Sequence, residues 1–325
     1  MQPPVAPLVS EKYAAIVVDA RSGRVLFERA ANAPRYPASL TKMMTLYLLF
    51  EAIDDGRVRL DEELPVSGFA ASRPPSRMGL KRGASIDART GRVLYEHASN
   101  EPRYPASLTK MMTLYLLFEA LDDGRLRPGE EIPVSAFAAA RPPSKLGIKR
   151  GGSVDTRTAI LALAVRSAND VAVAVAERLA GSEEAFARTM TAKARQLGMT
   201  GTHFRNASGL PDPAQRTTAR DMALLSVALH RRFPHHYHYF ANREFMFGGK
   251  VVRGHNGLLG RVPGVDGLKT GYIRASGFNL ATSAGRGGRR VVAVVMGGDS
   301  AAARDAHMVS LIETYLPRAS AGAGS

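Results

Sequence analysis

The sequence predicts an α/β chain of the α+β type, in which an antiparallel sheet is flanked by helices and an all-helical subdomain is inserted. Segments rich in β-branched and aromatic residues occur near the beginning of the chain and again after Tyr239. The residues between them follow helical patterns. With 325 residues, of which 45% are hydrophobic, the chain is long enough for a sizeable buried core.

Strands are expected where short apolar segments are separated by turn residues. Residues 14–18 and 24–27 are two such segments on either side of Ser22-Gly23, a hairpin signal, and residues 92–95 repeat the second. Later strands are expected at residues 245–247, 250–252, 267–272, 278–283 and 290–296, with a tight turn at residues 285–288.

Helices are expected mainly in the middle of the chain. Residues 107–121 are apolar on nearly all sides, which predicts a buried helix. It should stop at Asp122-Asp123-Gly124, so we interpret these aspartates as a helix-ending turn and not as a catalytic carboxylate pair. Further helices are expected at residues 156–167, 170–180, 183–197, 218–229 and 301–315.

Composition limits the classes of function. The net charge of +15 indicates either attraction to polyanions or merely an arginine-rich surface. No long basic run with interleaved aromatic residues occurs, so we favour the second interpretation and expect no nucleic-acid partner. Cysteine is absent, which excludes disulfides, cysteine catalysis and thiolate metal sites. No stretch approaches the roughly 18 apolar residues of a transmembrane segment, and residues 1–13 lack the apolar core of a signal peptide.

An internal repeat organises the first half of the chain. Residues 19–86 align without a gap to residues 87–154, and 17 of these 68 positions differ. Residues 35–52 return unchanged at residues 103–120. A solenoid needs three or more stacked units, so two copies followed by unrelated sequence indicate a duplication.

The two copies have different neighbours. A good strand, residues 14–18, precedes the first copy, whereas residues 81–86 before the second copy predict only a poor strand. Only the second copy continues directly into Asp155. We therefore expect four regions: an N-terminal segment with the first strand (1–18), a duplicated partial copy (19–86), the catalytic domain (87–317) and a disordered tail (318–325).

The first chemical motif is Ser107-Leu-Thr-Lys110. Residues three positions apart lie on one face of a helix, so the hydroxyl and the amine should be neighbours. Burial and the positive end of the helix dipole both disfavour a charged amine, and a neutral lysine can take the proton from a serine. Taken alone, the pattern also fits a serine that caps a helix followed by an exposed lysine.

Two further motifs follow. Ser167-Ala-Asn169 lies at a predicted break between helices, where a second hydroxyl could relay a proton and an amide could bind a peptide group; alone, it also fits a helix cap. Lys269-Thr270-Gly271 lies on a predicted strand, along which an extended peptide could add. There Lys269 and Thr270 would hold a carboxylate, and Gly271 would let the substrate backbone approach; alone, the lysine also fits a surface strand end.

The three motifs, in this order, resemble the serine DD-peptidases and their β-lactamase relatives. Within that superfamily the chain is similar to the D-alanyl-D-alanine carboxypeptidases of low molecular mass, which are penicillin-binding proteins. The resemblance covers residues 13–316 apart from the duplicate. It is carried by residues 104–112, 142–147, 166–170, 204–210, 217–221 and 263–272.

The resemblance implies a β-lactamase/DD-peptidase-like fold and a serine carboxypeptidase. Such an enzyme removes the terminal D-alanine of a peptidoglycan stem peptide ending in D-Ala-D-Ala through an acyl-enzyme, without a metal or cofactor. β-Lactam antibiotics would be covalent inhibitors, and the cell envelope or periplasm would be the location.

The resemblance also implies roles for individual residues. Ser107 would be the nucleophile and Lys110 its base, whereas Ser167 and Asn169 would assist proton transfer and substrate binding. Lys269 would bind the terminal carboxylate, and the backbone N–H groups of Ser107 and Tyr272 would form the oxyanion hole.

Three departures keep alternatives open. Ser39 and Lys42 in the first copy form an equally good local motif. The export signal expected in the family is not visible, and neither are the C-terminal β-domain and membrane anchor of many members. A catalytically impaired peptidoglycan-binding protein and a DD-endopeptidase therefore remain alternatives.

A histidine-rich segment is left over. Residues 234–239 contain three histidines, but no His-Glu-x-x-His pattern supports a metal site. We therefore expect a solvated turn there.

Overall fold

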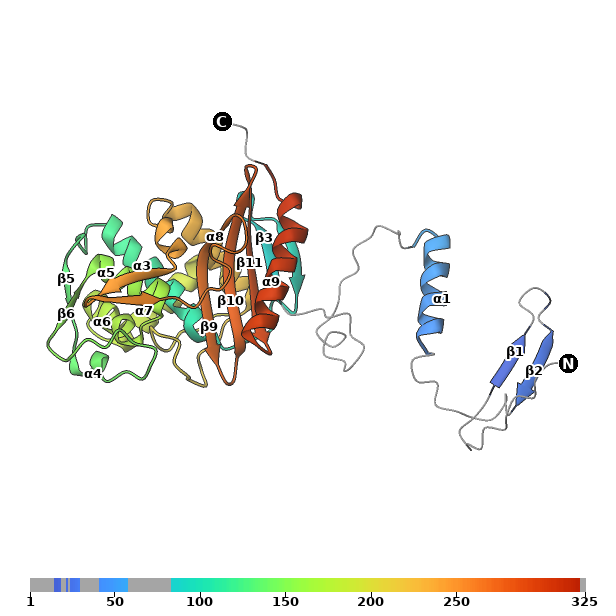
Figure 1. Cartoon of the computed structure of the whole chain (residues 1–325), viewed down its shortest axis with the longest axis horizontal. Coiled ribbons are helices and arrows are strands. Elements are labelled where there is room, and N and C mark those ends of the chain that lie inside the picture. The colour runs from blue at the N-terminus through green and yellow to red at the C-terminus, as the bar shows by residue number, and fades with distance from the viewer. Residues whose placement is uncertain (1–14, 19–21, 23, 30–40, 58–82, 322–325) are drawn as a thin grey trace. The chain divides into compact units, whose positions relative to one another are not determined.

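The computed structural model describes residues 15–18, 22, 24–29, 41–57 and 83–321. The chain divides into two compact units, residues 1–64 and 65–325, which are described separately here (Figure 1). Ser39, the serine of the first-copy motif, lies outside the described residues.

In the first unit, β1 (Ala15–Val18) pairs antiparallel with β2 (Val25–Arg29), and α1 spans Thr41–Asp54. The α1 helix leaves large apolar side chains exposed, namely Met44, Tyr47, Leu48 and Phe50. The identical residues of the second copy lie in α3 (Lys110–Asp122), where every residue from Lys110 to Ala120 is buried. The same sequence thus forms a helix in both copies, and in the second copy this helix is buried in the core of its unit.

The second unit contains a five-stranded antiparallel sheet in the order β4-β3-β11-β10-β9. Its strands are β3 (Gly83–Asp87), β4 (Val93–His97), β9 (Val265–Ile273), β10 (Gly277–Arg286) and β11 (Arg289–Gly298). The predicted α+β class with an antiparallel sheet is confirmed. Strand β9 lies at one edge, so one side of it is not paired within this sheet.

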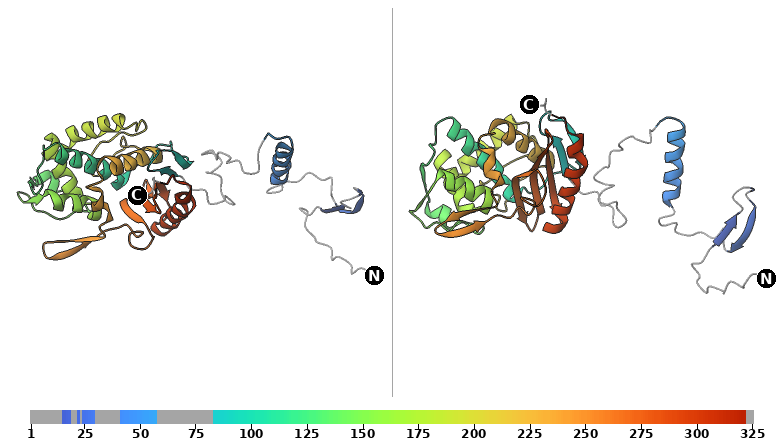
Figure 2. Two further views of the ribbon diagram at one scale, coloured as in Figure 1. Left: turned by 90° about the horizontal axis from the view of Figure 1, so that it is seen from above. Right: turned by 45° about the horizontal axis from the view of Figure 1, so that its top comes forward.

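Alternating side chains of β11 build two cores. Val291, Ala293 and Val295 pack toward α9 (Ala301–Tyr315), which covers one face of the sheet. Val292 and Val294 pack on the other face, toward α3 and α8 (Ala219–Arg232). Figures 1 and 2 show α9 on one side of the sheet and the helical region on the other.

The helical region supplies the second wall of the unit. It contains α4 (Ala136–Ala139), α5 (Thr156–Leu161), the π-helical turn η3 (Ala162–Arg166), α6 (Asn169–Ala180) and α7 (Glu183–Gln196). Two short strand pairs, β5 (Glu131–Pro133) with β6 (Ser153–Asp155) and β7 (Glu244–Phe247) with β8 (Lys250–Arg253), lie at its margins. None of the helices in the described residues is long and apolar enough to cross a membrane.

One strand expectation is wrong. We expected residues 81–86 to be a poor strand, yet β3 (Gly83–Asp87) lies between β4 and β11 and pairs with both. Pairing on both edges outweighs the low strand propensity of its glycine, alanine and serine. Small residues are also needed there, because a Cβ on Gly83 would lie 2.6 Å from the Val294 carbonyl oxygen. The sheet therefore begins before the expected domain start at Asp87.

The expected disordered tail is also partly wrong. The turn η5 (Leu316–Arg318) follows α9, and Ala319 is fully buried. Arg92 donates a hydrogen bond to the Arg318 carbonyl at 2.9 Å, and the Ser320 N–H donates to Asp87 at 2.8 Å. These contacts fasten residues 318–320 to the beginning of the sheet. Residues 322–325 lie outside the described residues.

Replacing Ser85 with alanine should stabilise the second unit. The Ser85 hydroxyl is fully buried in β3 and has no hydrogen-bond partner among the residues that the structure describes, and such a group costs about 1–3 kcal/mol. We expect Ser85→Ala to raise the melting temperature by roughly 2–12 °C, measured by calorimetry. The matched control is Ser153→Ala, because Ser153 is the counterpart of Ser85 in the repeat and donates a hydrogen bond to Glu131. An equal rise in both variants would contradict the interpretation.

Candidate active site

A cleft of about 430 Å³ lies between the edge strand β9 and the helical region. It brings together six of the eight predicted site residues: Ser107, Ser167, Asn169, Thr270, Gly271 and Tyr272. The other two, Lys110 and Lys269, are buried directly behind the lining, with at most 1% of each side chain exposed. Residues from three separate motifs therefore meet in one place.

Ser107 lies on the 3₁₀ turn η2 (Ala106–Thr109), which leads into α3. Two glycines allow this turn to fit against its neighbours. A Cβ on Gly209 would lie 1.8 Å from the Ala106 carbonyl oxygen, and a Cβ on Gly271 would lie 3.1 Å from the Ser107 nitrogen. The absence of side chains at these positions lets β9 and the loop at Gly209 approach the serine closely.

Lys110 lies one helical turn after Ser107, with its Nζ 3.4 Å from the serine Oγ. The same nitrogen donates to Asn169 Oδ1 at 2.7 Å and to the Ser208 carbonyl at 2.5 Å. Burial, reinforced by the charge of Lys269, holds the pKa of Lys110 well below its usual range. A neutral amine has two N–H donors and one lone pair, so these two acceptors leave the lone pair for the Ser107 hydroxyl.

Ser167 follows the π-helical turn η3 and adopts a left-handed conformation with φ of 63°. Such strain in a non-glycine residue is concentrated at functional sites. Its Oγ is buried, lines the cleft and has no hydrogen-bond partner among the described residues. The hydroxyl is therefore available to a group that enters the cleft.

Asn169 begins α6 and uses both ends of its amide within the protein. Its Nδ2 donates to the Pro142 carbonyl at 2.9 Å, while its Oδ1 accepts from Lys110. Asp170 next to it accepts hydrogen bonds from the N–H groups of Leu146 and Gly147. These two residues hold the 142–147 loop, one of the segments that carry the family resemblance, against the cleft.

Lys269 differs from expectation in its position. We expected it to meet the substrate carboxylate, but it is not among the residues that line the cleft, and its Nζ donates to the Thr270 carbonyl at 3.0 Å. Burial and the neighbouring Arg304 lower the pKa of Lys269 to about 7. The Lys269 side chain therefore lies behind Thr270, and its contact with a substrate carboxylate stays a prediction.

Arg304 and His255 are cleft residues that the motifs did not identify. Arg304 lies on α9, is 4% exposed and pairs with Asp305 at 2.7 Å. Nothing in the local sequence of α9 distinguishes this arginine from many others in a basic chain. Only the packing of α9 against β10 and β11 brings it to the cleft.

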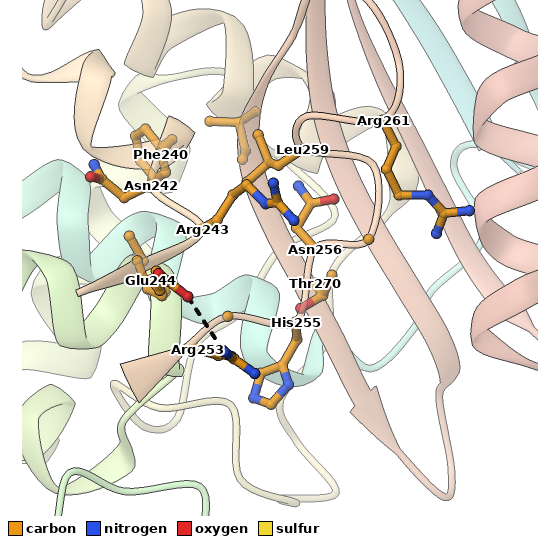
Figure 3. Close-up of a pocket in the computed structure, with 15 residues that line it drawn as sticks. Phe240, Asn242, Arg243, Glu244, Arg253, His255, Asn256, Leu259, Arg261 and Thr270 are labelled. Atoms are coloured by element: carbon orange, nitrogen blue, oxygen red, sulfur yellow. Dashed lines mark hydrogen bonds and ion pairs between the residues drawn. The ribbon is translucent and has the colours of Figure 1, made fainter. Parts of the chain in front are cut away.

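A second cavity, of about 420 Å³, shares Thr270 and His255 with the cleft (Figure 3). Arg243, Arg261 and Asn256 line it, and neither arginine has an ion-pair partner in the described part of the chain. The Asn256 Nδ2 is buried and has no hydrogen-bond partner there. The cavity therefore offers unused donors next to the cleft.

The comparisons with known proteins agree with this geometry. The model of the S11 peptidase family, described as D-alanyl-D-alanine carboxypeptidase, matches the chain twice, at residues 4–86 and 81–300. The D-alanyl-D-alanine carboxypeptidase DacD of Escherichia coli is 38% identical over 251 residues, which cover 74% of this chain and 65% of that protein. DacF of Bacillus subtilis is 34% identical over 238 residues, covering 72% and 61%. The chain thus spans less than two thirds of these relatives.

Solved structures show the same fold. The D-alanyl-D-alanine carboxypeptidase DacD of Francisella tularensis has a TM-score of 0.71 and 28% identity, covering 81% of this chain and 74% of that one. Penicillin-binding protein 6B of Escherichia coli has a TM-score of 0.69 and 34% identity, covering 78% and 81%. Penicillin-binding protein D2 of Listeria monocytogenes, in its cefotaxime-bound form, has a TM-score of 0.66 and 30% identity, covering 74% and 98%. The chain belongs to the D-alanyl-D-alanine carboxypeptidase family of S11 peptidases.

Proposed function

We propose that this protein is a serine carboxypeptidase that removes the terminal D-alanine from peptidoglycan stem peptides ending in D-Ala-D-Ala. The observation that carries the proposal is the environment of Lys110. Its two N–H groups have acceptors in Asn169 and Ser208, so its lone pair remains for the Ser107 hydroxyl. A buried, neutral amine in this position is a general base for a serine nucleophile.

Acylation begins when Ser107 Oγ attacks the carbonyl carbon of the penultimate D-alanine and its proton passes to Lys110. The backbone N–H groups of Ser107 and Tyr272 are proposed to hold the developing oxyanion, and one such donor contributes about 3–4 kcal/mol. Collapse of the intermediate breaks the peptide bond, and the departing amine takes a proton through the Ser167 hydroxyl. Water, deprotonated by Lys110, then hydrolyses the acyl-enzyme.

The substrate is proposed to bind as an extended strand along β9. This strand lies at the edge of the sheet and borders the cleft with Thr270, Gly271 and Tyr272. The terminal carboxylate would contact Thr270 and Arg304, which line the cleft, and Lys269, buried behind Thr270, would add charge only in its protonated form. Asn169 would position Lys110 through its Oδ1, and the second N–H of its Nδ2 would remain for the peptide.

The same chemistry accounts for inhibition. We propose that β-lactam antibiotics acylate Ser107, because Listeria penicillin-binding protein D2, which is 30% identical, has been solved in cefotaxime-bound and ampicillin-bound forms. Peptidoglycan as the substrate implies a location in the cell envelope. A peptidoglycan-binding protein without catalysis is the alternative, and it would not form the covalent adduct.

A second candidate activity is DD-endopeptidase cleavage of cross-linked peptides. The cavity with Arg243, Arg261 and Asn256 favours it, because it adjoins the cleft at Thr270, where the terminal carboxylate is proposed to bind. A cross-linked peptide continues beyond the scissile bond and would extend into this cavity. Its carboxylates would meet two arginines that have no ion-pair partner among the described residues.

Replacing Ser107 with alanine should abolish covalent labelling by a fluorescent penicillin, because the nucleophile is lost. The matched control is Ser39→Ala, the same change at the identical position of the first copy, which should keep most of the label. Mass spectrometry of the labelled peptide identifies the serine. An adduct on Ser39 would show that the wrong copy has been assigned.

The acylation rate should fall as the pH is lowered, because Lys110 accepts a proton only when its amine is neutral. Burial lowers the pKa of Lys110 well below the 10.5 of an ordinary lysine, so the rate should fall only well below that pH. The check is a profile of kcat/KM with a D-Ala-D-Ala peptide from about pH 5 to about pH 10. If kcat/KM already falls while the pH is lowered through the alkaline range, Lys110 titrates as an ordinary lysine does. That result would contradict the mechanism.

Arg243→Ala should reduce kcat/KM for a cross-linked peptide about tenfold, the effect of one lost charge-assisted hydrogen bond. The effect on the uncross-linked pentapeptide should be smaller, because its carboxylate stops at Thr270. The control is Arg188→Ala, which removes an exposed arginine on α7 that pairs with Glu184. Equal losses for both substrates would count against the endopeptidase activity.

A further inference from the structure

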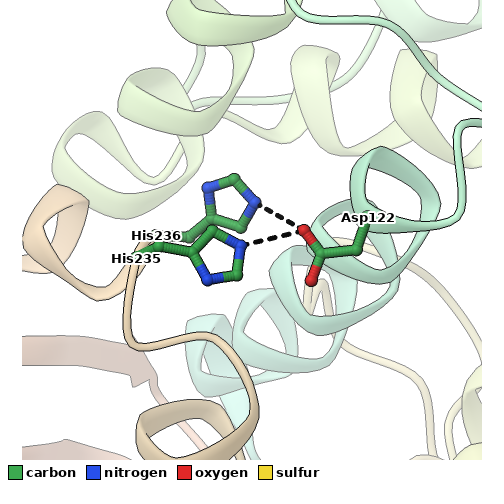
Figure 4. A group of neighbouring side chains, drawn as sticks. All are labelled: Asp122, His235 and His236. Atoms are coloured by element: carbon green, nitrogen blue, oxygen red, sulfur yellow. Dashed lines mark hydrogen bonds and ion pairs between the residues drawn. The ribbon is translucent and has the colours of Figure 1, made fainter.

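A group of three potential metal ligands lies at the end of α3 that is remote from Ser107. Asp122 is the last residue of α3, and His235 and His236 follow α8 in the connection to η4 (Tyr237–Ala241). Figure 4 shows both imidazole rings directed at the same carboxylate. The Nε2 atoms of His235 and His236 lie 2.9 Å and 3.1 Å from Asp122 Oδ1.

The spacing of these atoms is close to what a metal ion requires. The three donor atoms lie within 4.8 Å of one another. Zinc binds histidine nitrogen and carboxylate oxygen at 2.0–2.2 Å in a tetrahedral arrangement, which places neighbouring ligand atoms roughly 3.3 Å apart. The two oxygen–nitrogen distances are within a few tenths of an ångström of that value. A small rotation of the exposed His235 ring would complete the geometry.

The surroundings favour ligation over a simple ion pair. The ring of His236 stacks on Phe118, with centroids 4.8 Å apart, which fixes its orientation. Asp123, the neighbouring carboxylate, is already paired with Arg125 at 3.0 Å and does not compete for the histidines.

We propose that Asp122, His235 and His236 form a binding site for a divalent transition-metal ion of the zinc type. Two imidazoles and one carboxylate are ligands that such an ion prefers, and calcium or magnesium would require more oxygen atoms. Because all three ligands are at least partly exposed, water would complete the coordination. The motif-based expectation of a solvated turn at residues 234–239 did not include the aspartate, which is 113 residues away in the sequence.

The role of this site is structural. Asp122 is twelve residues after Lys110 on one helix, so roughly 18 Å separate it from the catalytic amine. A metal ion here would join the end of α3 to the segment that follows α8. The proposal does not depend on the assigned carboxypeptidase activity, and each can fail without the other.

The test measures metal binding by the full chain. After treatment with a chelator, the protein is titrated with Zn²⁺ while its melting temperature is followed, and with Co²⁺ while its visible spectrum is recorded. At a metal concentration about 100-fold above the dissociation constant, we expect the melting temperature to rise by roughly 5–10 °C. Co²⁺ should give the intense visible bands of a low-symmetry site.

Two variants and a matched control decide the outcome. His235→Ala and Asp122→Asn should remove both the thermal shift and the Co²⁺ bands, and His235 is exposed enough for its replacement to be tolerated. His238→Ala removes a histidine of the same segment that is outside the group, and this variant should respond as the unchanged protein does. No thermal shift in the unchanged protein, or an equal shift in His235→Ala, would overturn the proposal. Penicillin labelling of Ser107 should be the same with and without the metal.

Discussion

The burial of one amine constrains the rest of the catalytic unit. An ammonium group with no exposed surface is costly, so burial holds the pKa of Lys110 well below its usual range. Its reactivity then depends on where the single lone pair points. Asn169 from the start of α6 and the Ser208 carbonyl from a separate loop take the two N–H groups. Three distant segments must therefore stay in register for the lone pair to face Ser107.

Several neighbouring residues keep Ser107, Lys110 and their hydrogen-bond partners close together. Gly209 and Gly271 let the Ser208 loop and strand β9 approach the serine turn more closely than any residue with a side chain would allow. Asp170 holds the 142–147 loop, whose Pro142 carbonyl accepts the other end of the Asn169 amide. These residues thus set where the Lys110 amine lies relative to the Ser107 hydroxyl. The left-handed backbone at Ser167 belongs to the same arrangement and places in the cleft a hydroxyl that has no hydrogen-bond partner within the described ranges.

The features that could be predicted from the sequence are those set by residues close together in the chain. The strands after residue 265 alternate between two cores, and that period of two is visible in the sequence. The spacing of Ser107 and Lys110 fixes their contact within one helical turn. Strand β3 was underestimated because pairing on both edges compensates for its weak propensity. Arg304, the burial of Lys269 and the grouping of Asp122 with two histidines depend on contacts between distant segments, which no local pattern records.

The position of strand β3 determines what the loss of one copy of the repeat would change. Residues 83–86 end the first copy and also begin the sheet of the second unit, so the duplication created its own replacement for the strand at residues 15–18. The identical stretch at residues 35–52 and 103–120 is a natural place for homologous recombination to delete one copy. Such a deletion would join residues 15–18 to the remaining copy and put Val17 where Ser85 now lies. A shortened descendant would exchange the buried hydroxyl for a hydrocarbon side chain while keeping every residue of the catalytic cleft.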